Sequence, residues 1–587
     1  MEEIPDGPEL RRAWNQLALK VERPQVFYTY EWSLAVARAY SASLHPLLCL
    51  ACDETESLCG VVALAKAADG SRTSFLCATT GDYCDFLCLP EDKFPFVAAV
   101  LAELRRRNLG AVTLANLPAD STTVDALRRA SEQNGYYCFA RTAYICAQVS
   151  LRDLERRPGE NRPVLPGRKN LRRALSAMGK EAPVRLEHAR SWDAIGPILP
   201  QFSRAHVARF LVTGRISNLA CPERRAFLEK LAKLLAESGW LALTRMMSGN
   251  HALAWNYGFQ FQGTWFWYQP TFDSDLERYS PGFCLLAKVI EEAAENPALS
   301  VVDLGLGAEE YKDRFANQTR ETLYVTLRAS KSQHVREELR YRTAKVLKKS
   351  AGVEAGARRI TGWLLEWRER ARSEGLATTL RQMGKPVSKF LWSEEEILLF
   401  EWDGSALPDS GLGRMEKLDL NLLASATLQS FDNKATLGYL LRAAARLREK
   451  NAEGFGLADS DGLFVSFAWV GTFDGVCFQE LGRKIEAPSE DGVVLFDCWT
   501  PLRGRGDAAI GQLSRLVAER MREEGKKTWM FGAASNTSLI QQLEAAGFQP
   551  RYSVLRRQVL GWQKIRRRIS KDGGAQAGEA AARIQVR

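Results

Sequence analysis

A strand, a glycine-rich basic loop and a helix follow one another between residues 491 and 513, and this segment constrains the chain most. The apolar run Val493–Phe496 predicts a buried strand. Apolar residues recur at helical spacing from Ile510 to Met521. The loop between them carries Arg503, Gly504, Arg505, Gly506, Asp507 and Ala508. Glycines let a ligand approach the backbone, and the free N–H groups of a helix start attract anions, so the segment predicts a phosphate- or pyrophosphate-binding loop.

Length and composition limit the number of domains and the kinds of partner that the chain can have. A chain of 587 residues has room for about three or four domains. Its net charge of +10 suits an anionic ligand or a membrane surface, but by itself it does not indicate nucleic acid. The N-terminus is polar, and no run approaches the roughly 18 apolar residues of a spanning helix. We therefore expect a cytoplasmic protein, with peripheral contact to an anionic membrane as an open interpretation.

The pattern of cysteine and histidine predicts no metal site. Twelve cysteines lie mostly in apolar runs typical of reduced core residues. Cys49 and Cys52 have CxxC spacing, but on a strand such a pair faces opposite sides. The five histidines show no HxxxH spacing.

One supersecondary order appears three times along the chain: hairpin strands, a central strand, a loop, a helix and a further strand. Antiparallel strands followed by a βαβ unit predict a mixed sheet of the α/β (α+β) class. The expected divisions are residues 1–155, 163–330, a basic helical connector at 331–385, a third unit at 386–563 and a disordered tail at 570–587.

Residues of about 389–562 resemble the GNAT superfamily of acyl-CoA-dependent acyltransferases. Arg503, Gly506 and Ala508 match its [Q/R]-x-x-G-x-[G/A] signature, and Asn536 and Gly547–Phe548 follow at the expected spacing. The resemblance implies that residues 503–508 hold the pyrophosphate of acetyl-CoA or another acyl-CoA, and that Asn536 lines the cofactor channel. The reaction needs a base for the nucleophile, and Asp497 near the central strand is a candidate. Leu543 stands where many relatives carry the tyrosine that acts as the general acid.

Residues of about 1–330 resemble the CelD-like acetyltransferases, which are related to the FemAB peptidyltransferases. The matching segments are YSPG at 279–282 and DLGLGAEEYKDRF at 303–315. The resemblance implies a tandem pair of GNAT-like units, of which the first, with PEDK before Phe94, has a poor phosphate loop. Candidate catalytic residues are Asp303, Tyr311 and Lys312. Candidate substrate residues are His206, Arg209, Tyr279, Ser280 and Gly282; Ser280 suits a helix N-cap, with Pro281 at the first helical position.

The sequence therefore predicts an acyl-CoA-dependent N-acyltransferase that acts on a small-molecule, glycan or lipid-linked precursor of the cell envelope or an exopolysaccharide. Two alternatives stay open: a FemAB-like transferase that takes its donor from aminoacyl-tRNA, and a non-catalytic scaffold that uses the fold for binding. Basic clusters at residues 167–175 and 564–571 can contact phosphates or the anionic inner leaflet. DNA is not an expected partner, because aromatic residues do not interleave with these clusters.

Overall fold

The computed structural model describes residues 1–569 apart from 71, 156–162, 308, 348–391, 406–412, 450–451, 476–486, 502–507 and 560–561. The chain forms two compact units. The first unit comprises residues 1–209 and 217–347, and the second comprises 210–216 and 348–587. Each unit is built around its own mixed sheet, which confirms the predicted α/β class.

The first unit consists of two halves of similar element order. The first half contains α1 (Pro8–Lys20), η1 (Val26–Tyr28), α2 (Tyr30–Ala39), β1 (Leu44–Cys52), β2 (Leu58–Ala67), β3 (Thr73–Phe75), β4 (Leu87–Cys88), η2 (Pro90–Asp92), α3 (Lys93–Arg106), β5 (Ala111–Pro118), α4 (Thr123–Gln133) and β6 (Tyr137–Ser150).

The second half begins after the linker that precedes residue 163. It contains α5 (Arg168–Met178), β7 (Val184–Ala189), α6 (Trp192–Ile195), α7 (Leu199–Val212), η3 (Asn218–Ala220), α8 (Pro222–Leu235), β8 (Leu241–Ser248), β9 (His251–Phe261), β10 (Thr264–Phe272), η4 (Ser274–Tyr279), α9 (Pro281–Glu295), β11 (Val301–Asp303), α10 (Glu310–Asp313), β12 (Gln318–Arg328) and α11 (Lys331–Leu347).

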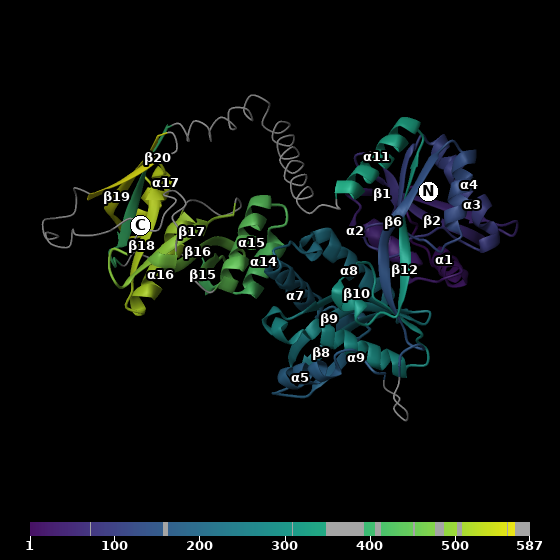
Figure 1. Ribbon diagram of the computed structural model, residues 1–587, viewed down its shortest axis with the longest axis horizontal. Helices are drawn as coiled ribbons and strands as arrows, with labels where there is room; N and C mark the ends of the chain where they lie inside the picture. Colours follow the sequence, from purple (N-terminus) through teal and green to yellow (C-terminus); the bar gives the residue numbers. More distant parts are fainter. Residues whose placement is uncertain are drawn as a thin grey trace. The chain divides into compact units, whose positions relative to one another are not determined.

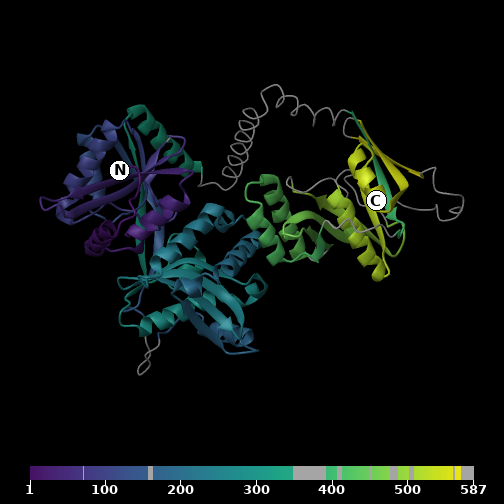
Figure 2. The same ribbon diagram turned by 180° about the vertical axis from the view of Figure 1, so that it is seen from behind.

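The two halves share one twelve-stranded sheet, in the order β1-β2-β3-β5-β12-β6-β11-β10-β9-β8-β7, with β4 paired to β2. The halves exchange their last strands. The first half's β6 pairs with β11 of the second half, and the second half's β12 pairs with β5 of the first half. Strands β6 and β12 also pair with each other along their length, and Figures 1 and 2 show them running side by side between the halves. The exchange makes the two halves one folded body.

Helix α9 covers the second half's sheet because one of its faces is apolar. Its side chains at Leu285, Leu286, Val289 and Ile290 are fully buried in a core that includes Trp265 of β10. Burying each such side chain contributes on the order of 1.5–3 kcal/mol before conformational entropy is counted. This packing sets the position of the helix's first turn.

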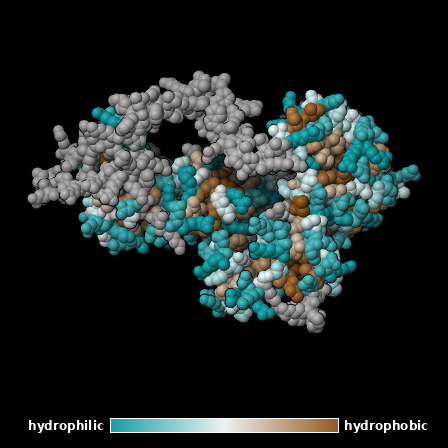
Figure 3. Space-filling view, viewed as in Figure 1, coloured by the Kyte–Doolittle hydropathy of each residue, from teal (hydrophilic) through white to brown (hydrophobic). Residues whose placement is uncertain are grey.

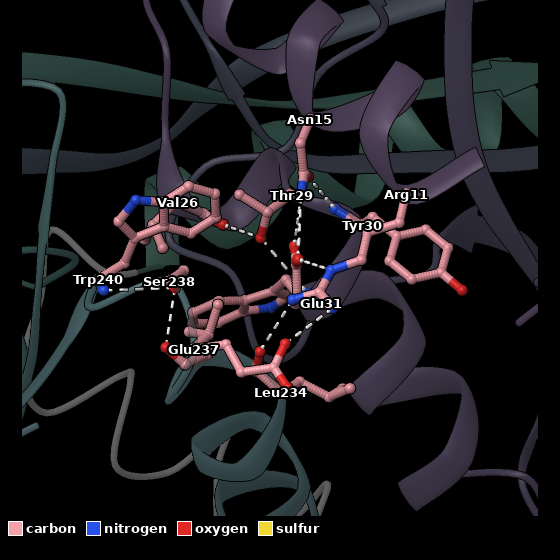
Figure 4. Close-up of polar contacts among 12 residues, drawn as sticks. Arg11, Asn15, Val26, Thr29, Tyr30, Glu31, Leu234, Glu237, Ser238 and Trp240 are labelled. Carbon is pink, nitrogen blue, oxygen red and sulfur yellow. Dashed lines mark hydrogen bonds and ion pairs between the residues drawn. The ribbon is translucent and has the colours of Figure 1, made fainter. Parts of the chain in front are cut away.

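A buried ion pair between α1 and α2 also connects the two halves (Figure 4). Glu31 is 1% exposed, accepts a hydrogen bond from Arg11 Nε at 2.6 Å, and accepts two from Asn15 Nδ2 at 3.0 Å. The Arg11 guanidinium also donates hydrogen bonds to the Leu234 carbonyl and to the carboxylate of Glu237, which lies just beyond α8. A buried charge is retained only when it is paired and hydrogen-bonded in this way.

The second unit contains β13 (Trp392–Trp402), β14 (Arg414–Lys417), α14 (Leu420–Gln429), α15 (Lys434–Glu449), β15 (Ala452–Ala458), β16 (Phe464–Thr472), η5 (Phe473–Gly475), β17 (Gly492–Trp499), α16 (Ala508–Glu523), β18 (Lys527–Ala533), α17 (Thr537–Ala545), β19 (Phe548–Val559) and β20 (Trp562–Ile569). Its sheet runs β14-β15-β16-β17-β18-β13-β19-β20. Strands β17 and β18 are parallel, and β13, from the start of the unit, lies between β18 and β19.

The surface is mostly hydrophilic on the face seen in Figure 3, with separate, smaller hydrophobic areas. Large apolar side chains that are exposed include Ile145 on β6 and Leu339 on α11. None of the described helices has both the length and the apolar character that crossing a membrane requires.

Candidate active site

A cavity of about 770 Å³ lies in the second half of the first unit. Its wall is built from α5, α7, the end of β10, η4, the start of α9, and α10. Five residues named from the sequence line it together: Arg209, Tyr279, Ser280, Gly282 and Tyr311. A volume of this size is typical of sites that enclose a small molecule or a cofactor.

The turn into α9 places backbone N–H groups at this cavity. Ser280 adopts a left-handed conformation (φ 52°, ψ 55°), and Pro281 opens the helix. Ser280 is thus the N-cap residue, as predicted, but its side chain makes no capping hydrogen bond. The first N–H groups of a helix lack intrahelical partners and carry partial positive charge, so this end of α9 favours an anion.

The backbone of Gly282 lies close to the Phe272 ring. A Cβ atom there would lie 3.2 Å from Cδ1 of Phe272, on the strand that leads to the turn. This close approach brings β10 and the start of α9 together along one wall of the cavity.

Positive charge predominates on the cavity wall. Arg173, Arg209, Arg278 and Arg314 line it, against the acidic Glu277 and Glu310. Arg209 donates from Nη1 to the Pro270 carbonyl at 3.0 Å, and its guanidinium carbon lies 4.9 Å from the ring centre of Phe272. These contacts fix the Arg209 side chain beside the apolar wall, so the cavity combines cationic groups with aromatic surface.

Tyr311 contributes a phenol to this site. It lies on α10, and burial raises the pKa of its hydroxyl, with the nearby Lys312 acting in the opposite direction. The phenol therefore stays protonated at neutral pH and can donate a hydrogen bond or a proton inside the cavity.

Lys312 turns away from the cavity and holds the chain between β11 and α10. Its ammonium group donates to the Leu306 carbonyl at 2.8 Å and pairs with Glu309 at 2.7 Å. With 4% of the residue exposed, the lysine acts on the loop rather than on the cavity.

Asp303 ends β11 and is 1% exposed. Its carboxylate accepts hydrogen bonds from the Tyr83 hydroxyl at 2.8 Å, Gln148 Nε2 at 2.7 Å and the Gly305 backbone N–H at 2.8 Å. Tyr83 and Gln148 belong to the first half, so Asp303 lies where the two halves meet.

His206 lies on α7 one turn before Arg209 but does not line the cavity. It is 3% exposed, and its Nδ1 lies 2.8 Å from the Ser217 hydroxyl. Burial lowers the pKa of His206 to about 3, with Arg209 and Arg224 as further causes, so the ring is neutral at physiological pH.

In the second unit, the loop residues Arg503, Gly504, Arg505, Gly506 and Asp507 lie outside the described residues. Ala508 begins α16. Asn536 caps α17 by accepting from the Leu539 backbone N–H at 3.2 Å. Leu543 is fully buried in the core of the unit.

Asp497 lies in an irregular part of β17, with φ 47°. Two residues of β17, Asp497 and Cys498, lie opposite the single residue Ala468 of β16, which is a β-bulge. The Asp497 carboxylate pairs with Arg446 Nη1 at 2.6 Å. An acceptor hydroxyl or amine would compete with this guanidinium for the carboxylate.

Residues 167–313 match the family model of the acetyltransferase (GNAT) domain. The match spans the cavity and contains Asp303, Tyr311 and Lys312. It confirms the GNAT resemblance for this half and supports transfer of an acyl group as the class of chemistry. No curated protein matches the sequence.

Solved structures resemble the chain at low identity. FemX has a TM-score of 0.39 at 10% identity and covers 54% of this chain and 95% of its own. L-PGS from Bacillus licheniformis has 0.35 at 12%, with 52% and 95% covered. A conserved protein of unknown function from Bacteroides thetaiotaomicron has 0.39 at 12%, with 55% and 98% covered.

Sequence reasoning identified part of the cavity's cationic wall. The basic cluster at residues 167–175 was noted for phosphate contact, and it supplies Arg173 from α5. Arg278 and Arg314 were missed, although each lies next to or within a matching segment, at YSPG and at EYKDRF. Among the described residues, no three His, Cys, Asp or Glu side chains come together as a metal site.

Proposed function

We propose that this protein transfers an acyl group from acyl-CoA to an amine of a cell-envelope or exopolysaccharide precursor, and that the cavity of the second half binds the donor. The observation that carries the proposal is the meeting of the α9 N-terminus with four arginines and an aromatic wall in one cavity. A pyrophosphate placed at the helix end would meet backbone N–H groups and guanidinium groups together.

These residues can supply general acid–base catalysis and electrostatic stabilisation. The nucleophile has to lose a proton, and the leaving thiolate has to gain one. Tyr311, which burial keeps protonated, is the donor that we assign to the leaving group. The loop at residues 503–508 of the second unit stays a second candidate for the acyl-CoA phosphates.

Calorimetric titration of acetyl-CoA into the full-length protein tests the proposal. We expect Arg278→Glu to weaken binding at least about tenfold, because the variant reverses a charge beside the anion site. Arg128→Glu is the matched control, since this arginine is 62% exposed on α4, away from the cavity. The variant Arg503→Glu separates the two candidate donor sites.

Each result has a distinct meaning. If wild-type protein at high concentration gives no heat with acetyl-CoA, the proposal is wrong. If Arg503→Glu abolishes binding while Arg278→Glu does not, the donor binds in the second unit. If acetyl-CoA is inert and an aminoacyl-tRNA donates its aminoacyl group, the protein is an aminoacyl transferase instead.

A further inference from the structure

The parallel strands β10 and β11 separate beside the cavity. Their pairing ends at Phe266 and Asp303. Strand β10 then bulges, since Trp267 and Tyr268 lie opposite the single residue Gly258, and continues along the cavity to Phe272. After Asp303 the chain turns through Gly305 towards α10.

A loop of the first half, residues 77–84, is fixed at this point by both halves. Asn116 of the first half donates to the Gly81 carbonyl at 2.9 Å. From the second half, Arg224 donates to the Thr79 carbonyl at 3.4 Å, and the Tyr268 hydroxyl donates to the Thr80 carbonyl. At the far end, the Tyr83 hydroxyl donates to Asp303. Hydrogen bonds on both sides of Asp82 therefore fix its backbone.

Asp82 and the cavity residue Trp267 flank the same glycine. A Cβ atom on Gly305 would lie 2.6 Å from Oδ2 of Asp82 and 3.6 Å from the Trp267 carbonyl oxygen. Gly305 has φ 71°, so both the backbone conformation and the space exclude a larger residue there. The Asp82 side chain remains partly accessible.

The surroundings of Asp82 make it a base at neutral pH. Burial, and after it the Asp303 carboxylate, raise the pKa of its carboxyl, which is about 7 in these surroundings. Lys312 on α10, Arg224 on α8 and the backbone N–H of Leu306 act in the opposite direction. The other titratable groups that interact with Asp82 include Tyr83 and Cys84 of the same loop, Cys146 of β6 and Tyr268 of β10, and the pKa of each is raised, so these groups stay neutral.

We propose that Asp82, presented by the first half at the separation of β10 and β11, is the general base that deprotonates the acceptor amine. This inference rests on the proposed function. The acceptor ammonium gives a proton to the Asp82 carboxylate, and the neutral nitrogen forms a bond to the acyl carbon. The bond from that carbon to the donor sulfur breaks, the leaving thiolate takes a proton from the Tyr311 hydroxyl, and Tyr311 recovers a proton from the acylated nitrogen, which is left as a neutral amide. One active site is then assembled from two halves: the second half binds the donor, and the first half supplies the base.

Infrared difference spectra of the full-length protein between pH 5 and pH 9 test the ionisation without a substrate. We expect a protonated carboxyl C=O band that disappears near pH 7 in wild type and in Asp125→Asn, and that Asp82→Asn lacks. Asp125 is the control because its side chain is 82% exposed on α4. A wild-type spectrum without a carboxyl that titrates near neutrality overturns the inference.

Thiol release from acetyl-CoA with glucosamine as the probe acceptor tests the role in transfer. We expect Asp82→Asn to lower kcat about 100-fold or more without changing acetyl-CoA affinity. We also expect Asp303→Asn to move the acidic limb of the kcat/KM profile to lower pH, which a purely structural role would not do. If acetyl-CoA turns over but Asp82→Asn retains the wild-type rate and pH profile, the inference fails and the proposed function stands. If acetyl-CoA does not bind to wild type, the proposed function fails, and the assignment of Asp82 as its base fails with it.

Discussion

Replacing Asp82 by asparagine should change how the stability of the first unit depends on pH. The carboxyl has an ordinary pKa of 3.8 and a pKa of about 7 in the folded protein. The folded state therefore holds the proton more tightly, and its contribution to stability is present below about pH 3.8 and is lost as the pH rises through 7. The full difference corresponds to roughly 4 kcal/mol. Because water reaches part of the side chain, we expect an observed loss of about 2–4 kcal/mol.

Hydrogen exchange detected by mass spectrometry can measure this in the full-length protein. Peptides that cover residues 77–84 and 301–307 report the free energy of opening at the junction of the halves. Between about pH 4 and pH 8, that free energy should fall in wild type and in the control Asp125→Asn, and fall by about 2–4 kcal/mol less in Asp82→Asn. Equal pH dependence in all three proteins would show that Asp82 does not titrate in this range and would refute the reasoning.

Three further variants test the surrounding structure. The folded protein holds His206 neutral, so wild type should lose about 2 kcal/mol more stability than His206→Gln when the pH in urea denaturation falls from about 7 to 5. Glu31→Ala should cost about 2–4 kcal/mol in the same assay, because it removes the carboxylate that Arg11 and Asn15 share; a cost under about 1 kcal/mol would contradict this. Tyr311→Phe should lower kcat for thiol release about 100-fold and leave acetyl-CoA affinity unchanged, whereas an unchanged kcat would exclude the phenol as the proton donor.

Much of the fold was predictable because its signals are local. The order of antiparallel strands followed by a βαβ unit predicted the mixed sheet, and YSPG predicted a helix that begins at Pro281, as observed. The same segment brought Tyr279, Ser280 and Gly282 to the cavity. His206 and Arg209 show the limit of such reasoning. They lie three residues apart on one helix, yet His206 is packed against Ser217, close in the chain, whereas Arg209 lines the cavity beside Pro270, which is 61 residues away.

The glycine-rich loop at residues 503–508 predicted a phosphate site, and residues 503–507 of this loop lie outside the described part of the chain. The structure adds a second candidate site, the cavity in the second half of the first unit. No local signal predicted that a cavity forms there. Its wall combines α5 with the turn into α9 and with α10, both of which lie more than a hundred residues after α5 in the chain. Helix and sheet packing alone bring these elements together.

The sequence by itself determined the class of fold, the start of α9 and the GNAT resemblance of the second half, because apolar strand runs, helix caps and motif spacing act over a few residues. Only the tertiary structure decided that β6 and β12 exchange between the halves and that Asp82 lies beside Gly305. Both features depend on contacts between residues far apart in the chain, and burial among such contacts is what makes an ordinary loop aspartate a base.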